Sequence, residues 1–183
     1  MATKCFVYIA TSLDGFIARE NGALDWLPQG ETNDGEDFGY LRFFELIDTL
    51  VMGSHSYEKV LSFGEWPCTD KKVVVLSSRN LSIPEDLEFN VEVLNLKPRD
   101  LVQHLSQQGS KHLYIDGGKT IQAFIREGLI DEMTITRVPI LLGTGRPLFG
   151  PVDNDTICHH IETTAFTNGF VQSRYTIQRQ NLK

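Results

Sequence analysis

Apolar residues in this chain of 183 residues fall into short runs that alternate with stretches of helical periodicity. A run of about four to eight apolar residues between turn residues is typical of a buried strand. An apolar stripe at positions i, i+3 and i+4 is typical of a helix that packs on a core. The expected strands are 4–10, 48–52, 71–79, 91–94, 113–116, 131–140, 158–165 and 170–178. The expected helices are 37–47, with a wide buried face, 53–61, 98–107 and a fourth that begins near residue 121.

Strands that alternate with helices predict a mostly parallel sheet, because each crossover helix returns the chain to the same end of the sheet. The last two expected strands are instead joined by Phe166-Thr167-Asn168-Gly169, and Asn-Gly between alternating runs predicts a hairpin. The chain shows no internal repeat, low-complexity tract or linker, and its length suits one domain over residues 1–183. The pattern therefore predicts a single α/β sandwich with an antiparallel edge.

Charge and cysteine content narrow the kind of partner. The net charge of −7 and the pI near 5.2 argue against nucleic acid and anionic membranes, since both favour a basic surface. No apolar run approaches the length of a membrane span, and the first residues lead into a strand pattern rather than a signal peptide. Cys5, Cys68 and Cys158 are scattered and lack metal-ligand spacing. We therefore expect reduced thiols, no metal and a cytoplasmic location.

Three strand ends carry residues suited to an anion, namely Gly53-Ser54-His55-Ser56, Ser77-Ser78-Arg79 and Gly117-Gly118-Lys119-Thr120. In the first and third, glycine allows a tight turn into a helix whose first amide groups are unpaired. The second supplies hydroxyls and a guanidinium. A single Gly-Gly is equally an ordinary turn, and neither a Walker loop nor the dinucleotide-binding glycine motif is present. Open α/β sheets bind ligands beyond the carboxyl ends of their strands, so the three ends together predict a seat for a diphosphate.

The same residues, in the same order, resemble the dihydrofolate reductase-like superfamily. The resemblance rests on Asp14-Gly15-Phe16-Ile17-Ala18, Val51-Met52-Gly53-Ser54-His55-Ser56-Tyr57-Glu58, Val73-Val74-Val75-Leu76-Ser77-Ser78 and Ile115-Asp116-Gly117-Gly118. Three segments look more like the reductase domain of riboflavin biosynthesis and its stand-alone relatives, namely Ser12-Leu13-Asp14-Gly15, 129–132 and 139–149. This resemblance implies a three-layer sandwich with a mixed, mostly parallel sheet of about eight strands. It also implies a homodimer formed through the C-terminal strands.

The resemblance further implies NADPH as the cofactor. Ala10 and Ile17 would contact the nicotinamide, two helix termini would hold the diphosphate, and the strand end with Arg79 would line the adenosine ribose and its 2′-phosphate. The implied cofactor-binding residues are Ala10, Ile17, Gly53, Ser54, His55, Ser56, Ser77, Ser78, Arg79, Gly117, Gly118, Lys119, Thr120 and Ile121. A cis peptide between Gly117 and Gly118 is also implied.

One departure from the folate reductases concerns the 2′-phosphate. Those enzymes usually carry Arg or Lys at the position of Ser54 as its partner. In this chain Arg79, Lys72 and Lys71 are the remaining candidates. The preference for NADP over NAD therefore stays open at the level of the sequence.

The candidate catalytic residue is Asp37, near the start of the first expected helix, where folate reductases keep the carboxylate that holds the pterin ring. Asp37 or an ordered water would supply a proton, although an acid at this position equally complements a helix dipole. The residues expected around the substrate are Asp14, Trp26, Asp37, Leu41 and Tyr57. Asp14 equally suits a turn, and Trp26 equally suits packing within the long polar loop 21–36. We assign no chemistry to Asp116.

Two classes of function follow. The first is an NADPH-dependent reductase of a small heterocycle, pterin-like or aminopyrimidine-like. The resemblance allows either 5-amino-6-(5-phosphoribosylamino)uracil reductase activity or dihydrofolate reductase activity. The second is a non-catalytic NADP(H)-binding protein that has kept the fold. In either class the cofactor would supply the redox chemistry, and the protein would bind and orient it.

Overall fold

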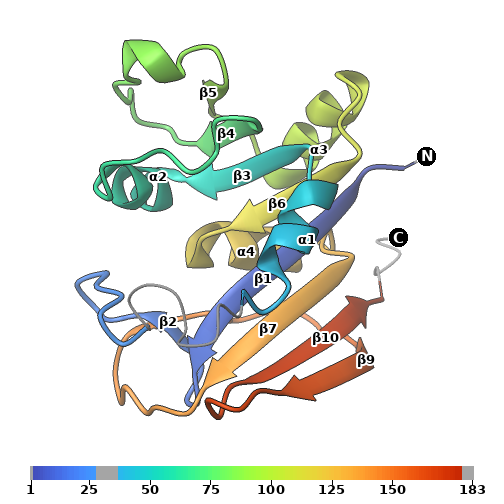
Figure 1. The fold of residues 1–183 in the computed structure, drawn as a ribbon. Coiled ribbons are helices and arrows are strands. Elements are labelled where there is room, and N and C mark those ends of the chain that lie inside the picture. The colour runs from blue at the N-terminus through green and yellow to red at the C-terminus, as the bar shows by residue number, and fades with distance from the viewer. Residues whose placement is uncertain (1, 28–36, 179–183) are drawn as a thin grey trace.

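The computed structural model describes residues 2–27 and 37–178 (Figure 1). The strands are β1 Lys4–Ser12, β2 Phe16–Ala18, β3 Thr49–Gly53, β4 Lys72–Leu76, β5 Val91–Leu94, β6 His112–Asp116, β7 Glu132–Val138, β8 Arg146–Pro147, β9 Cys158–Ala165 and β10 Val171–Ile177. The helices are α1 Tyr40–Leu46, α2 Ser54–Leu61, α3 Pro98–Gln107 and α4 Gly118–Arg126, with a short 3-10 helix at Glu85–Leu87.

Eight strands form one sheet in the order β5-β4-β3-β6-β1-β7-β10-β9. The pairs from β5 to β7 are parallel, whereas β10 runs antiparallel to β7 and β9 runs antiparallel to β10. β1 occupies the middle of the sheet, as its nearly continuous apolar sequence predicts. The predicted class, the mixed sheet of eight strands and the C-terminal hairpin are therefore confirmed. β2 and β8 pair separately as a small antiparallel sheet.

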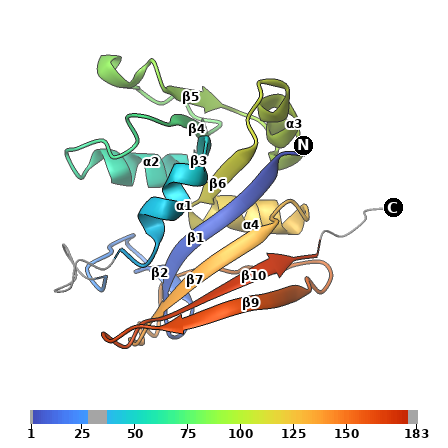
Figure 2. The same ribbon diagram turned by 45° about the vertical axis from the view of Figure 1, so that its right-hand side comes forward.

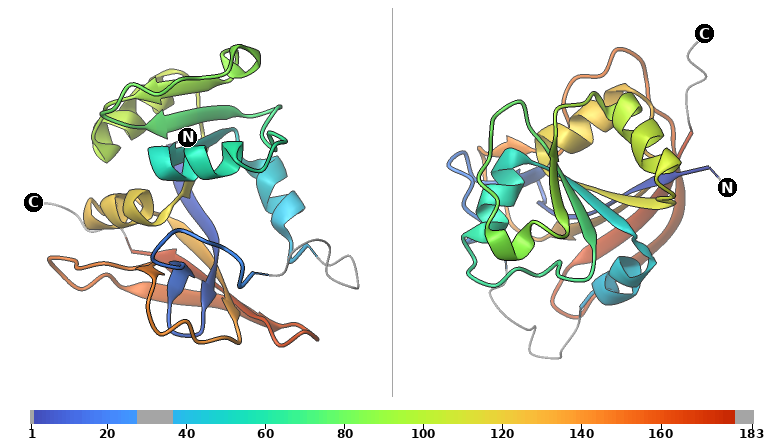
Figure 3. Two further views of the ribbon diagram at one scale, coloured as in Figure 1. Left: turned by 90° about the vertical axis from the view of Figure 1, so that its left-hand side faces the viewer. Right: turned by 90° about the horizontal axis from the view of Figure 1, so that it is seen from above.

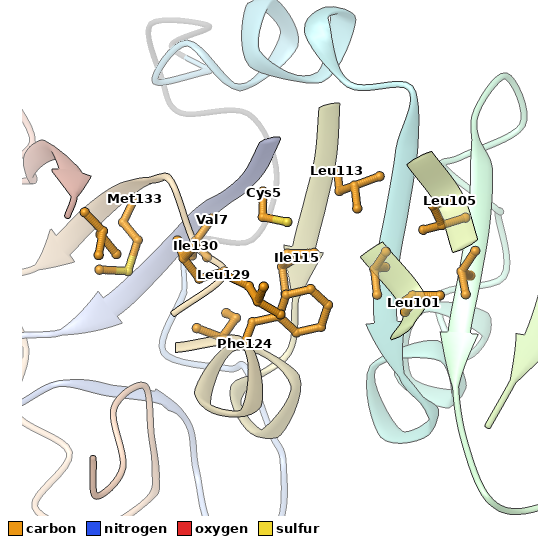
Figure 4. Packing of buried hydrophobic residues seen from close by; sticks show 14 of the residues in the cluster. Cys5, Val7, Leu101, Leu105, Leu113, Ile115, Phe124, Leu129, Ile130 and Met133 are labelled. Carbon is orange, nitrogen blue, oxygen red and sulfur yellow. The ribbon is translucent and has the colours of Figure 1, made fainter. Parts of the chain in front are cut away.

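Helices cover both faces of the parallel part of the sheet, which makes the predicted three layers. On one face, Leu101 of α3 and Phe124 of α4 are fully buried against residues such as Leu113 of β6 (Figure 4). On the other face, Phe43 of α1 and Tyr57 of α2 pack on a second apolar cluster. Apolar spacing of three and four residues places one side of each helix on the sheet, and burying these side chains supplies most of the driving force for folding.

The hairpin of β9 and β10 extends beyond this helical cover (Figure 2). All eight residues of β9 are exposed, whereas β10 is partly buried where it pairs with β7. The turn after β9 is closed by bonds from Phe166 N–H to Phe170 O and from Gly169 N–H to Phe166 O. β9 is therefore an open edge strand whose backbone groups remain available on one side.

The first helix differs from its prediction. The sequence pattern predicts a helix over 37–47 with a wide buried face, but α1 begins at Tyr40 and contains no buried residue. Phe38 and Gly39 have φ angles of 57° and 84°, which lie in the left-handed region and cannot continue a right-handed helix. The prediction was wrong because apolar periodicity does not register these two turn residues.

No helix within the described ranges is long and apolar enough to cross a bilayer. The three cysteines are free thiols, two of them buried and Cys158 exposed. Burial raises the pKa of the Cys68 thiol to about 11, so this side chain stays protonated and serves as part of the core.

Candidate active site

The three strand ends predicted to bind an anion are neighbours in the sheet. β4, β3 and β6 lie side by side and run parallel, so their carboxyl ends meet at one edge. Gly53 pairs with Leu76, and Met52 pairs with Asp116. The helices α2 and α4 both start at this edge, which faces the viewer in the left panel of Figure 3. The structure therefore brings the predicted segments into one site.

Between β3 and β6 the backbone forms a cradle in which Gly53 and Gly117 leave little room for a side chain. A Cβ atom on Gly117 would lie 2.4 Å from Ser56 Oγ, and one on Gly53 would lie 3.0 Å from Thr120 Oγ1. Neither α2 nor α4 has a side-chain hydrogen bond at its N-cap, so the amide groups of both first turns lack that partner. A cradle with two uncapped helix termini fits the diphosphate of a nicotinamide dinucleotide.

The peptide geometry at this cradle corrects one expectation. The family resemblance implies a cis bond between Gly117 and Gly118, but the described residues contain no cis peptide. Gly117 instead has φ 87° and ψ 133°, and it forms the N-cap of α4. This positive φ turns the chain from β6 into the helix, and glycine adopts it without a steric penalty.

β1 and β2 border the part of the site that the family resemblance assigns to the nicotinamide. A Cβ atom on Gly118 would lie 2.8 Å from Ile17 Cδ1, so Ile17 directly adjoins the cradle. Ala10 is partly exposed and packs beside Val138 and Phe170. Both residues therefore border the edge of the sheet at the place where the resemblance puts the nicotinamide ring.

Ile121 is too buried for its implied role. Its side chain is 0% exposed in the core, and its N–H donates to Gly117 O at 2.9 Å within the helix. Neither group remains for a cofactor contact, so we remove Ile121 from the candidate set. Lys119 and His55 are exposed at the first turns of α4 and α2, where they remain available to an anion.

Beyond the carboxyl end of β4, Arg79 lies over the start of α2. Its Nη2 donates to Ser54 Oγ at 2.9 Å and to Glu58 Oε1 at 3.0 Å. Its backbone is held by Ser77, whose Oγ accepts from Arg79 N–H at 2.9 Å and donates to Arg79 O at 3.1 Å. Ser78 is exposed beside it. The hydroxyls and the guanidinium predicted at this strand end therefore form one polar group.

Asp37 caps the first helix. Its carboxylate accepts from Gly39 N–H and Leu41 N–H, both at 2.9 Å. These two bonds hold the pKa of Asp37 below its usual value, and the bond from Leu41 has the larger effect. An exposed carboxylate that is ionised at neutral pH can pair with a cationic or amidine group, but it is a poor proton donor. Leu41 itself is 65% exposed beside it.

Two other predicted substrate residues lie in the interior. Tyr57 is 1% exposed in the core and packs edge-on against Trp66 at a centroid distance of 5.7 Å. Trp26 is buried in a cluster with Val138 and Phe170. Residues 28–36 of the long loop that follows lie outside the described residues. The structure thus gives Tyr57 and Trp26 packing roles.

Asp14 joins two loops that are far apart in the sequence. Its Oδ2 accepts from Gly143 N–H at 2.7 Å and from Leu142 N–H at 3.1 Å, and its Oδ1 accepts from Ser12 Oγ at 2.6 Å. These bonds lower the pKa of Asp14, and the bond from Ser12 has the largest effect. Asp14 therefore positions the loop after β7 against the end of β1.

Replacing Asp14 with asparagine is expected to loosen the loop after β7. The amide oxygen carries no net charge and accepts the Leu142 and Gly143 N–H groups more weakly than the carboxylate does, so both amides should exchange hydrogen faster. Because the pKa of Asp14 is lowered on folding, its stabilising effect is present above about pH 4 and is lost as the pH falls through the lowered pKa. Asp25→Asn, in another loop, is the control, and unchanged exchange in Asp14→Asn would contradict the role.

The sequence interpretation assigned no chemistry to Asp116, the last residue of β6. Strand alternation puts it on the same face as Tyr114, on the side of the sheet that α1 covers. Desolvation raises the pKa of Asp116, and hydrogen bonds from Gly117 N–H and with the Tyr114 side chain offset only part of that rise. The signal that could have identified it is an acid ending a buried strand directly before the glycine cradle.

The surroundings of Asp116 act on its pKa in opposite directions. Desolvation raises the pKa, whereas the hydrogen bond with the Tyr114 side chain favours the ionised form, and the Tyr114 hydroxyl also donates to Tyr8 O at 2.8 Å. Continuing the β1–β6 register places Tyr8 beside Asp116 and Ala10 two residues further. Asp116 thus lies beside Tyr8 of β1.

The fold and the site together define a reductase-type domain of the dihydrofolate reductase-like class. Residues 3–172 match the model of the RibD C-terminal domain. The chain belongs to this family, and it is therefore an oxidoreductase of the riboflavin-pathway reductase type.

Individual relatives agree with this assignment. YwjB of Bacillus subtilis (strain 168) is 38% identical over 160 residues, which are 85% of this chain and 88% of YwjB. A crystal structure from Shewanella sp. PV-4, whose name refers to riboflavin biosynthesis, is 42% identical with a TM-score of 0.90, covering 97% of this chain and 100% of that one. A deaminase/5-amino-6-(5-phosphoribosylamino)uracil reductase from Thermotoga maritima shares the fold, with a TM-score of 0.73 at 13% identity over 97% of this chain and 57% of that one.

Proposed function

We propose that the protein is a cytoplasmic NADPH-dependent reductase of a small heterocycle of the pterin or aminopyrimidine type. The observation that carries the proposal is the position of Asp116, a carboxyl with a raised pKa, directly before the glycine cradle between α2 and α4. Such a reduction needs a seat for the dinucleotide diphosphate and a carboxyl that can donate a proton, and a raised pKa makes Asp116 better suited to that role than an ordinary aspartate. The reductase named in the Thermotoga maritima protein supports the aminopyrimidine version by analogy of fold.

When bound, NADPH supplies a hydride from its nicotinamide ring. The first turns of α2 and α4 hold the diphosphate, while Ala10 and Ile17 border the ring. Asp116 keeps a proton in its desolvated position and donates it to the substrate nitrogen or oxygen that gains the electrons, which balances the reduction of a C=N or C=O bond. Asp37, ionised at the start of α1, anchors a polar group of the heterocycle.

Two measurements test the proposal. NADPH affinity is measured by quenching of tryptophan fluorescence, and NADPH oxidation is followed by absorbance with a panel that includes dihydrofolate, other pterins and ribosylaminopyrimidines. We expect binding and the oxidation of at least one substrate. Binding without oxidation of any member would favour a non-catalytic NADP(H)-binding protein. Failure of NADPH to bind below millimolar concentration would exclude both.

We also propose that the protein is a homodimer that pairs through its C-terminal strands. The support is the open edge strand β9, all of whose residues are exposed, including Ile161. Light scattering after gel filtration should give twice the chain mass of 20.7 kDa. Ile161→Lys should give the single mass with the same circular dichroism. A wild-type monomer at micromolar concentration would contradict this proposal.

A further inference from the structure

The guanidinium of Arg79 is shared between a hydroxyl and a carboxylate of the same helix. Ser54 and Glu58 lie four residues apart on one side of α2, and Arg79 Nη2 contacts both, at 2.9 Å and 3.0 Å. The ion pair is open to water, since the side chains of Arg79 and Glu58 are 53% and 47% exposed. A bound anion can therefore reach the guanidinium without opening the core.

The guanidinium retains free donors in this arrangement. Within residues 2–27 and 37–178, Nε and Nη1 of Arg79 make no hydrogen bond, so only one of its nitrogens is occupied. The N–H groups of Nε and Nη1 point to opposite sides of the guanidinium, so each offers a phosphate one separate contact. A bidentate contact would also need Nη2, for which the phosphate competes with Ser54 and Glu58. The site thus accepts a phosphate, but only with the carboxylate of Glu58 next to it.

We propose that Glu58, acting through Arg79, determines how strongly this protein prefers NADPH over NADH. This inference rests on the proposed cofactor site, in which Arg79 faces the adenosine ribose. The two coenzymes differ only in the 2′-phosphate, so a carboxylate beside that position penalises NADPH and leaves NADH nearly unaffected. The same carboxylate holds the guanidinium against Ser54, so Glu58 both orients the phosphate partner and weakens the phosphate contact.

Glu58→Gln separates the charge of the side chain from its hydrogen bond. The glutamine oxygen still accepts from Arg79 Nη2, but the negative charge is gone. We expect NADPH to bind about three- to tenfold more tightly, with the Kd for NADH changed less than about twofold. The gain should shrink at about 1 M salt, because exposed charges are then screened over roughly 3 Å.

Two further variants give the comparison its controls. Glu58→Ala removes both the charge and the contact, so its NADPH affinity should lie below that of Glu58→Gln. Glu92→Gln causes the same change of net charge and breaks the pair with Lys72 at 3.2 Å. Lys72 is the first residue of β4, at the opposite end of that strand from Arg79, so the structure removes it as a partner of the 2′-phosphate and the pair lies away from the site. Glu92→Gln should leave both dissociation constants unchanged.

The readout is the ratio of the dissociation constants for NADH and NADPH, obtained from fluorescence quenching without any substrate. A ratio that rises in Glu58→Gln and not in Glu92→Gln supports the role of Glu58. An unchanged or lower ratio in Glu58→Gln, with both coenzymes bound by the wild type, overturns it and leaves the proposed reductase intact. If the wild type binds neither coenzyme, the proposed cofactor site itself is wrong.

Discussion

Asp116→Asn is expected to lower the turnover number by about a hundredfold or more, with the Kd for NADPH changed less than about twofold. The asparagine keeps the size and the hydrogen bond of the carboxyl but carries no acidic proton. A positioned general acid contributes about 10²–10⁴ to a rate, so its removal should affect the chemical step and not cofactor binding. Steady-state NADPH oxidation and fluorescence quenching measure the two quantities separately.

The pH dependence gives an independent check on Asp116. Because desolvation raises its pKa, the folded protein holds this proton more tightly than the unfolded chain does. Stability from this group is therefore full below about pH 4 and declines as the pH rises through the raised pKa. Asp116→Asn should melt at a higher temperature than the wild type at pH 7, and the difference should vanish near pH 3.

Asp37→Asn is the matched comparison, since it too replaces one carboxyl with an amide, in this case near the start of α1. Asp37 is ionised and caps the helix, so we expect it to raise KM for the substrate more than it lowers turnover. A split of this kind assigns the proton to Asp116 and the anchoring role to Asp37. Turnover at the wild-type level in Asp116→Asn would remove Asp116 from the chemistry, and an ordered water would become the donor.

Gly117→Val is expected to weaken NADPH binding by more than a hundredfold in a protein that still folds. The position has a φ of 87°, and a Cβ atom would lie 2.4 Å from Ser56 Oγ. A rotation of Ser56 could relieve a single methyl group, whereas the branched side chain of valine also fills the cradle between α2 and α4. The backbone conformation alone should cost about 1–3 kcal/mol of stability.

Gly109→Val provides the control for this backbone cost. Gly109 has a similar φ of 94°, and a Cβ atom there would meet nothing within 4 Å. It follows α3, away from the carboxyl edge of the sheet. Both variants should melt at lower temperature, but only Gly117→Val should lose NADPH affinity. Wild-type affinity in a folded Gly117→Val protein would show that the cofactor does not lie in the cradle.

Much of the candidate site was predictable because the carboxyl ends of parallel strands lie at the same end of the sheet. Once Gly53, Ser77 and Gly117 were recognised as residues that follow buried strands, the strand–helix alternation placed all three at the same edge. Local signals were sufficient here, since glycine, serine and a following helix determine the geometry of each turn within a few residues.

Other features depend on partners that lie far away along the chain. Asp14 was predicted to contact substrate, yet its carboxylate binds Gly143, which is 129 residues away. Tyr57 stands within a recognised motif, but it is in the core because Trp66 and the α2 face of the sheet enclose it. No pattern along the chain reports which hydrogen bonds form between separate loops or which side of a short helix is covered.

The sequence by itself determined the class of fold, the order of the main strands and helices, and the position of the glycine cradle that we propose as the diphosphate seat, because periodicity and turn chemistry are local properties. Only the tertiary structure decided the surroundings of each acid, from which we propose Asp116 as the proton donor. The pKa of Asp37 is lowered because this exposed carboxylate accepts two backbone N–H groups, whereas the pKa of Asp116 is raised because its carboxyl is desolvated beside Tyr114. The acidity of a carboxyl group depends on the solvent exposure and the hydrogen-bond partners that folding gives it, and neither can be read from the order of residues in the sequence.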